Sequence, residues 1–402
     1  GTPGNLTGEF ILDDWKFGKG IDVITKSEPA FDYLKKLGYK TIVFHEHWTD
    51  IQNYPEAVGH EEQLKKLVKA FHDNGFQILV YFGYEIADNC PTWFDYKDEC
   101  LVAPTWQSYT RSNPVQKDYV VCYNSVWQDF IADGVDKLID KYDIDGVYLD
   151  STAIPWWCNN TYHGCGYVKP DGTIGQTFAY RGSRDMLRRL YTVVKSKKPN
   201  GQVNLHNSGH VPVQTIEWAT STWDGEHLTV LNGKHDIDEV IPLDAFRAEF
   251  MGRPLGVPAE FLCYDSPYTF HESFTMTLLH DVLVRARGYA MAEEGQIFKA
   301  MDSFGKKQAE YHPYWSNADL ATVNGKKAYT SLYVRKGKGV MCVVSSFSKD
   351  DQEVAVKLNL AKMKLGKKAT AINAITGDSL PMADGTFKVN LSGVDYALVW
   401  VK

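Results

Sequence analysis

The sequence lacks the features that mark several large classes of protein. It has no block of basic residues, and its formal net charge at pH 7 is −7 over 402 residues. This balance argues against nucleic acid and anionic membrane surfaces as partners. No apolar run approaches the roughly 20 residues that a membrane span needs. No glycine-rich phosphate loop or dinucleotide fingerprint is present either. We therefore expect no nucleic-acid partner, no membrane span and no cofactor.

Cysteine is scarce. The seven cysteines are odd in number and match no common zinc spacing, so no metal site is expected. Cys90 and Cys100 flank one loop, and Cys158 and Cys165 flank another. Each pair either closes a disulfide or remains as free buried thiols. Disulfides would indicate an oxidising compartment, so we expect a secreted, periplasmic or cell-surface protein whose signal segment is absent from this chain.

Aromatic residues, in contrast, are abundant: 11 Trp, 23 Tyr and 19 Phe, or 13% of the chain. Most are expected in the core. Residues 93–96 and 156–160, however, combine tryptophans with polar neighbours in loop-like contexts. Flat apolar rings with polar neighbours suit the C–H faces of sugars, so these segments indicate a carbohydrate ligand.

Strand and helix patterns alternate over about three hundred residues. The helix candidates include 61–72 and 126–142, whose apolar residues recur at helical spacing. The strand candidates are residues 10–12, 41–44, 77–82, 145–150, 202–205, 220–223, 260–263 and 289–291. Eight such units predict an α/β fold, a (β/α)8 TIM barrel over residues 1–315.

The pattern changes from about residue 316 onward. Short segments there alternate apolar with polar residues, and Gly- or Asp-containing turns separate them. Strands of this length and spacing are typical of an antiparallel β-sandwich. We predict a small C-terminal β-sandwich over residues 316–402.

Carboxylates stand at the ends of two predicted barrel strands. Asp150 ends the fourth strand, and Asp224 and Glu226 end the sixth. The carboxyl ends of barrel strands form one active-site face, so these acids are expected to converge. Two convergent carboxyl groups among aromatic residues indicate hydrolysis of a glycosidic bond.

A second layer of polar and aromatic residues follows the other strands. Sugar hydroxyls need donors and acceptors on every side, and such a ring would supply them. The predicted substrate-binding residues are Asp13, Trp15, His45, Glu46, His47, Trp48, Tyr84, Glu85, Trp156, Arg181, His206, Asn207, Trp223 and Asp265.

The segments 146–150 (Gly-Val-Tyr-Leu-Asp) and 223–226 (Trp-Asp-Gly-Glu) resemble the retaining α-galactosidase and α-glucosidase superfamily, glycoside hydrolase families 27, 31 and 36. Residues 181–184, 205–209 and 221–226 also resemble an uncharacterised group related to glycoside hydrolase family 123. The first resemblance implies a nucleophile after strand four, an acid/base after strand six and a C-terminal β-sandwich.

By that resemblance Asp150 is the nucleophile and Glu226 the acid/base, with Asp224 as the alternative acid/base. Family 123 enzymes use an adjacent Asp-Glu pair, whereas Gly225 separates the two acids here. The resulting hypothesis is an exo-acting, retaining glycoside hydrolase that removes a terminal sugar from an oligosaccharide or polysaccharide.

Two other functions remain open. His45 and His47, with His206 and either Asp265 or Asp150, would suit a metal-dependent barrel hydrolase. A non-catalytic glycan-binding barrel would use the aromatic residues but leave the strand-end acids without a role.

Overall fold

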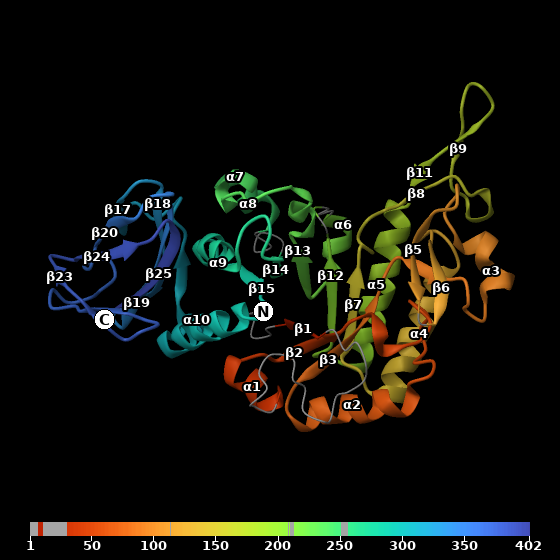
Figure 1. Cartoon of the computed structure of the whole chain (residues 1–402), viewed down its shortest axis with the longest axis horizontal. Coiled ribbons are helices and arrows are strands. Elements are labelled where there is room, and N and C mark those ends of the chain that lie inside the picture. Colours follow the sequence, from red (N-terminus) through yellow and green to blue (C-terminus); the bar gives the residue numbers. More distant parts are fainter. Residues whose placement is uncertain (1–6, 11–29, 113, 208, 210–212, 251–255) are drawn as a thin grey trace.

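An eight-stranded parallel sheet forms the centre of the larger part of the molecule (Figure 1). The computed structural model describes residues 7–10, 30–112, 114–207, 209, 213–250 and 256–402. In spatial order the strands are β1 (Thr7–Phe10), β2 (Thr41–Phe44), β3 (Gln77–Phe82), β7 (Gly146–Asp150), β12 (Gln202–His206), β13 (Ser221–Asp224), β14 (Ala259–Leu262) and β15 (Leu283–Arg285).

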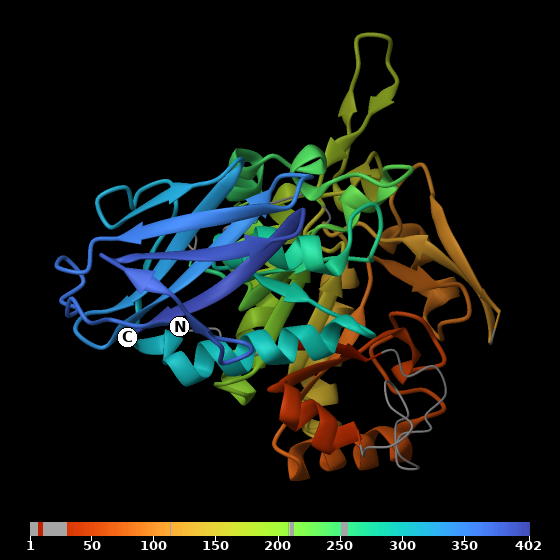
Figure 2. The same ribbon diagram turned by 60° about the vertical axis from the view of Figure 1, so that its left-hand side comes forward.

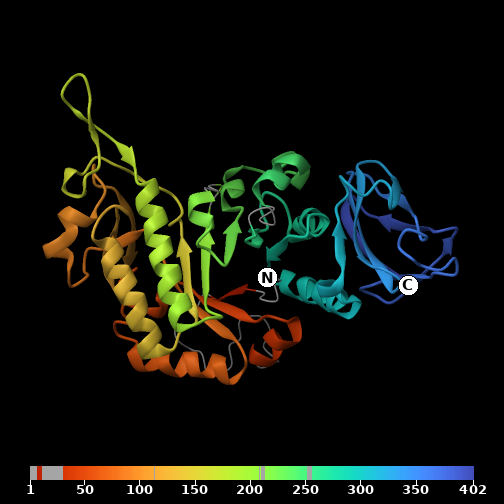
Figure 3. The same cartoon turned by 180° about the vertical axis from the view of Figure 1, so that it is seen from behind.

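Helices cover the outer face of this sheet. The principal ones are α1 (Ala30–Leu37), α2 (Glu61–Asp73), α4 (Trp127–Tyr142), α5 (Tyr180–Lys197), α9 (Phe270–Leu279) and α10 (Ala290–Phe304). Figure 3 shows α4 and α5 running alongside β7 and β12. Strand β7 is buried along its length up to Asp150, because both faces of a strand in a parallel sheet are covered. For the same reason its sequence is a nearly continuous apolar run.

The predicted α/β architecture is confirmed in its coarser form, a parallel βα sheet followed by a C-terminal β domain. The Cα atoms of the edge strands β1 and β15 come within 8 Å of each other. No hydrogen-bonded ladder joins these two strands among the described residues. Closure into a complete barrel stays a prediction.

Of the predicted strand 10–12, only Phe10 lies in β1, and residues 11 and 12 lie outside the described residues. Another predicted strand is wrong. Tyr289 is the N-cap of helix α10, residues 290 and 291 are the first of that helix, and the eighth strand is instead β15. Only three residues long, β15 is too short for its pattern to stand out.

Two long insertions follow β3 and β7. The first forms a three-stranded sheet of β4 (Glu85–Ala87), β6 (Val115–Val120) and β5 (Gln107–Ser112) and contains helix α3 (Trp93–Cys100). The second contains β8 (Trp157–Cys158), which pairs with β11 (Thr177–Phe178), and a hairpin of β9 (Tyr167–Val168) and β10 (Ile174–Gly175). The hairpin projects away from the body of the molecule (Figures 1 and 2).

The C-terminal part consists of two antiparallel sheets (Figure 2). One has the order β16 (Glu310–His312), β18 (Ala328–Arg335), β19 (Gly339–Phe347), β25 (Val394–Val401), β21 (Ala371–Asn373) and β22 (Ser379–Leu380). The other has the order β17 (Ala321–Asn324), β20 (Gln352–Leu358), β24 (Thr386–Leu391) and β23 (Met382–Ala383). Strand β16 pairs with β18; the exact boundary at residues 315/316 stays a prediction.

Helix α9 joins the two parts of the molecule. The hydroxyls of Ser331 and Ser345 donate to the carbonyls of Leu279 and Thr275, at 2.7 and 2.9 Å. Both serines are buried. The contact is therefore a packed interface with its polar groups paired.

All seven cysteines are free and buried. Neither Cys90–Cys100 nor Cys158–Cys165 forms a disulfide, so the disulfide argument for an oxidising compartment does not apply. Among the helices in the described ranges, none combines the length and apolarity needed to cross a membrane.

Candidate active site

The candidate site lies where β7, β12 and β13 end side by side. Asp150 at the end of β7 is in register with His206 at the end of β12, and His206 is in register with Trp223 of β13. Asp224 follows Trp223 as the last residue of its strand. Parallel strands in register place their last side chains at one edge of the sheet, which brings the predicted acids together.

Three polar side chains hold Asp150, and the Ser151 hydroxyl makes the longest of these contacts, donating to Oδ1 at 3.3 Å. Asp150 Oδ1 also lies 2.7 Å from His206 Nδ1, and Asp150 Oδ2 accepts a 2.8 Å hydrogen bond from the Tyr81 hydroxyl. Burial alone would raise the pKa of this carboxyl group, but the charge and hydrogen bond of His206 outweigh it and lower the pKa to about 2. Asp150 is therefore ionised at neutral pH, as a nucleophile requires.

His206 connects Asp150 to Glu226. Its Nε2 lies 3.2 Å from Glu226 Oε2, and only 3% of its side chain is exposed. Burial lowers the pKa of this imidazole, but the charges of Asp150 and Glu226 outweigh it, and the net pKa is raised. Because one ring bridges them, the two carboxylate oxygens lie within ~8 Å of each other. That limit includes the separation of retaining glycosidases, about 5–5.5 Å, and the shorter part of the range of inverting ones, about 6.5–9.5 Å.

Glu226 and Asp224 differ in their access to solvent. The Glu226 side chain, at the start of the 3-10 helix η3 (Glu226–Val230), is 46% exposed, whereas that of Asp224 is 3% exposed. Asp224 Oδ1 accepts hydrogen bonds from the backbone N–H groups of Gly209 and Gly225, at 2.7 and 2.8 Å. Glu226 thus faces solvent, whereas Asp224 is buried and fixed by the backbone.

A second imidazole lies between Asp224 and another acid. His227 Nδ1 is 3.5 Å from Asp224 Oδ1, and its Nε2 is 2.9 Å from Glu249 Oε1 at the end of helix α8 (Leu243–Glu249). Burial lowers the pKa of His227, but its contacts with the two carboxylates outweigh it and raise the pKa to about 9. The site therefore contains two acid–imidazole–acid chains side by side.

Aromatic rings from the two insertions pack together beside this edge, and we call Tyr84, Trp106 and Trp156 the aromatic wall. Tyr84 stacks on Trp156 with 4.8 Å between ring centroids, and Trp106 packs edge-on against Trp156 at 5.2 Å. Burial is the main cause of the raised pKa of Tyr84, and the charges of Glu85, Asp150 and Glu226 raise it further. The Tyr84 hydroxyl therefore lies within electrostatic reach of both predicted catalytic acids. Among the predicted binding residues, Tyr84 and Trp156 therefore lie together near the acids.

His45 also lies beside the site. Its ring is 4.3 Å from that of Tyr81, and its charge contributes to the lowered pKa of Asp150. Glu46, in the 3-10 helix η1 (Glu46–Trp48), is partly exposed beside it, with 3.8 Å between His45 Nδ1 and Glu46 Oε1.

Burial corrects three predicted binding residues. Trp48 is 1% exposed and donates its indole N–H to the Tyr81 carbonyl at 2.8 Å. Trp223 is fully buried and donates to Glu260 Oε2 at 2.7 Å. Glu85 is 2% exposed, and burial, reinforced by the charge of Asp150, raises its pKa to about 8. These side chains support the site from below and do not line its surface.

Other residues contact one polar side-chain atom of His47 and one of Asp265. His47 Nδ1 lies 2.7 Å from Arg111 Nη2. Asp265 Oδ1 accepts from the Tyr289 hydroxyl at 2.7 Å and from the N–H of Phe270, the first residue of α9, at 3.1 Å. Asp265 Oδ1 therefore satisfies the first N–H of α9, whose N-cap residue is Thr269, and a binding role for Asp265 is less favoured.

The remaining predicted binding residues are Arg181, Asn207, Asp13 and Trp15. Arg181 is exposed in the first turn of α5, and Asn207 is 2% exposed. Asp13 and Trp15 lie outside the described residues.

Two features of the site were absent from the sequence prediction. Tyr81, which holds Asp150, lies inside the apolar strand β3, where a phenol among apolar residues is the only signal of a polar role. Glu249 comes from a helix more than twenty residues away from Glu226 along the chain, and nothing local marks it.

The metal-hydrolase alternative is not favoured by the geometry. Two groups among the described residues have the spacing of metal ligands: Asp224 with His227 and Glu249, and a cluster of three cysteines with a histidine. Neither group includes His45 or His47. The Arg111 guanidinium beside His47 is also unfavourable for a nearby cation.

A parallel βα sheet with paired acids at its carboxyl edge, an aromatic wall and a C-terminal β domain is the architecture of a barrel glycosidase. Comparison with known families relates the chain to that class. Residues 293–389 match the family described as "Glycoside hydrolase 123, C-terminal domain", and residues 13–198 match a domain of unknown function, DUF6259. The first match confirms the relationship to glycoside hydrolases and to family 123, and with it the expected enzyme class, an O-glycosyl hydrolase.

Solved structures share the fold. An α-amylase from Geobacillus thermoleovorans, complexed with acarbose, is 12% identical with a TM-score of 0.61, over 99% of this chain and 98% of the other. The trehalose-6-phosphate hydrolase of Bacillus licheniformis is 10% identical with a TM-score of 0.61, over 99% of each chain. A GH27 β-L-arabinopyranosidase from Geobacillus stearothermophilus is 11% identical with a TM-score of 0.57, over 92% and 91%. No curated protein matches the sequence.

Proposed function

We propose that this protein is an exo-acting, retaining glycosidase in which Asp150 is the nucleophile and Glu226 the acid/base. The observation that carries the proposal is the chain Asp150–His206–Glu226 at the carboxyl edge of the sheet, with an ionised carboxylate at its inner end and a solvent-facing one at its outer end. The proposal includes closure of the eight strands into a complete barrel.

In the first step an oxygen of Asp150 attacks the anomeric carbon, and the bond from that carbon to the leaving oxygen breaks. Glu226 transfers its proton to the leaving oxygen. In the second step Glu226 accepts a proton from water, the water oxygen attacks the anomeric carbon, and Asp150 is released. Tyr81 and His206 are positioning residues, since each holds one oxygen of Asp150.

In this proposal Asp224 assists Glu226 and does not replace it as the acid/base. Two backbone N–H groups hold its Oδ1, and it lies two residues before Glu226. Its buried side chain makes it less suited than Glu226 to exchange a proton with a leaving group or water.

The aromatic wall supports a sugar substrate and an exo mode of attack. Tyr84, Trp106 and Trp156 come from the insertions after β3 and β7 and pack against one another, and Tyr84 lies within electrostatic reach of Asp150 and Glu226. Two long insertions beside the acids would obstruct a polymer that continued past them, which supports attack at a chain end. A polymeric substrate would in turn favour a secreted, periplasmic or cell-surface location, which we also propose.

The test is a panel of aryl α- and β-glycosides with wild type and four variants. We expect Asp150→Ala to abolish turnover and Glu226→Gln to lower kcat/KM by roughly 10²–10⁴-fold on substrates with poor leaving groups. Asp224→Asn should act less strongly on turnover. Asp171→Asn, at the tip of the projecting hairpin, is the control and should match wild type. Circular dichroism checks the fold of each variant.

NMR of the first-formed sugar reports the stereochemistry. Retention of configuration supports the proposed mechanism, and inversion would exclude Asp150 as a nucleophile while leaving a glycosidase. Wild-type rates in Asp150→Ala would refute its role. Sugar binding without turnover across the panel would favour a non-catalytic glycan-binding barrel.

A further inference from the structure

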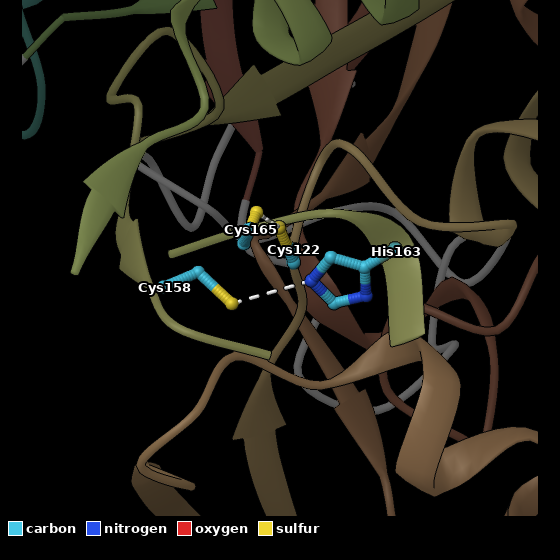
Figure 4. Close-up of side chains that lie close together, drawn as sticks. All are labelled: Cys122, Cys158, His163 and Cys165. Carbon is cyan, nitrogen blue, oxygen red and sulfur yellow. Dashed lines mark hydrogen bonds between the residues drawn. The ribbon is translucent and has the colours of Figure 1, made fainter. Parts of the chain in front are cut away.

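Three cysteines and a histidine gather at the base of the insertion that follows β7. Cys158, His163 and Cys165 come from this insertion, and Cys122 comes from the segment between β6 and α4 (Figure 4). One ligand atom from each of the four lies within 4.8 Å of the others. The three cysteines are buried, and His163 is half-buried.

The distances within this cluster suit a tetrahedral metal ion. Cys122 Sγ lies 3.7 Å from Cys165 Sγ, and Cys158 Sγ lies 3.2 Å from His163 Nε2. Tetrahedral zinc with bonds of about 2.3 Å to sulfur separates its ligand atoms by ~3.7 Å. A disulfide would need its sulfurs about 2.05 Å apart. The cluster therefore has the dimensions of a metal site and not of a disulfide.

The backbone presents three of these ligands from one compact turn. Asn160 caps the 3-10 helix η2 (Thr161–His163), since its side chain accepts a hydrogen bond from Tyr162 N at 3.0 Å. Gly164 then takes a left-handed conformation with φ of 76°, which turns the chain directly before Cys165. This turn brings Cys165 back beside Cys158.

The groups around the cluster are those that metal ligands require. His163 Nδ1 donates to the Glu99 carbonyl at 2.6 Å, so Nδ1 carries the proton and the lone pair of Nε2, which faces Cys158 Sγ, can bind a cation. Backbone N–H groups of Ala103 and Asn160 donate to Cys158 Sγ at 3.4 and 3.3 Å. The Asn124 side chain donates to Cys165 Sγ at 3.2 Å. Such donors stabilise the negative charge of thiolates.

We propose that Cys122, Cys158, His163 and Cys165 form a structural Zn²⁺ site. Four protein ligands of the Cys₃His type leave no position for substrate or water, which is the pattern of a structural and not a catalytic site. The metal would fasten the insertion after β7 to the chain that follows β6. Because Trp156 lies two residues before Cys158, the zinc would also fix the aromatic wall beside the acids.

Metal analysis of the purified full-length protein tests the proposal. We expect about one zinc per chain in wild type and almost none in Cys165→Ser or His163→Ala. Cys90→Ala is the matched control, because Cys90 is also a buried thiol but lies outside the cluster, and it should keep its zinc. Titration of wild type with a mercurial reagent should release that zinc as the thiols react.

A second measurement keeps the test valid if the ligand variants do not fold. Replacing zinc by Co²⁺ in wild type should give thiolate-to-cobalt charge-transfer bands and the intense visible bands of tetrahedral cobalt. Absence of zinc in wild type with no affinity for added zinc or cobalt, a Cys122–Cys165 disulfide in the intact mass, or iron in place of zinc would each overturn the proposal.

Discussion

At the scale of single residues, the charge state of the site depends on His206. This imidazole is almost fully buried and contacts both predicted catalytic acids. Asp150 is buried enough that its pKa would rise without a cationic partner. The low pKa of Asp150 is therefore a property of the pair and not of the aspartate alone.

This dependence predicts the behaviour of His206→Gln. The pKa of Asp150 should rise, because burial then acts with less opposition, and the acid limb of the kcat/KM profile should move to higher pH. The pH profile of wild type and variant checks this, with the exposed His235→Gln as control. An unchanged acid limb at reduced kcat would instead mean that His206 acts only through packing.

At the scale of elements, the link between β13 and η3 sets the direction of Glu226. Gly225 has a φ of +126°, a conformation that residues with a side chain rarely adopt. A Cβ atom at this position would lie 2.7 Å from the Leu262 carbonyl of β14. The N–H of Gly225 also donates to Asp224. One glycine therefore places both acids of the sixth strand.

Gly225→Ala should thus displace η3 and lower kcat, with destabilisation of about 1–3 kcal/mol from the strained backbone. Activity assays and chemical denaturation measure the two effects. Gly366→Ala is the control, since a Cβ there meets nothing within 4 Å. Unchanged kcat and stability in Gly225→Ala would show that the turn adapts and does not fix the acid.

At the scale of the whole molecule, His271 of α9 connects three elements across the interface between the two parts. Its Nδ1 lies 2.7 Å from Glu293 Oε1 of α10, and its Nε2 lies 2.8 Å from Asp395 Oδ1 of β25. Hydrogen bonds to Asp395 and Glu293 raise the pKa of His271 to about 9, against the opposing effect of burial. The imidazole is therefore charged at neutral pH and attracts both carboxylates.

The stability that His271 supplies should depend on pH. A raised pKa in the folded state means that this contribution is complete below the ordinary histidine pKa of about 6.5 and is lost as pH rises toward about 9. His271→Gln should therefore lower the thermal midpoint at pH 6 and converge with wild type above pH ~9. High salt should reduce the difference, because the histidine side chain is 42% exposed.

Thermal unfolding across this pH range, with His235→Gln as control, provides the measurement. A difference between His271→Gln and wild type that is the same at pH 6 and above pH ~9 would show that the imidazole contributes shape and not charge.

The parallel sheet, most of its strands and the C-terminal β domain could be predicted from the sequence. The apolar pattern along the chain identifies these strands, because it depends only on which faces of a strand are buried. Residues 78–82 are buried on both faces and form an apolar run, whereas residues 352–358 are buried on one face and alternate. The acids at the ends of β7 and β13 were visible for the same reason, because a charge that ends an apolar strand is a local feature. In the parallel sheet, the three-residue β15 was misplaced, and β1 lies at Thr7–Phe10 where residues 10–12 were predicted.

Tertiary structure alone decided which of these residues share a site. Trp48 and Trp223 are predicted to bind substrate, but packing buries them; Tyr81 reads as a core residue, but it holds Asp150. The cysteines fit no common zinc spacing because Cys122 lies 36 residues before Cys158 along the chain and meets it only in the fold. Periodicity reports whether a residue is buried, whereas the partner of a buried polar group is set by chain segments distant in sequence, and no local pattern records it.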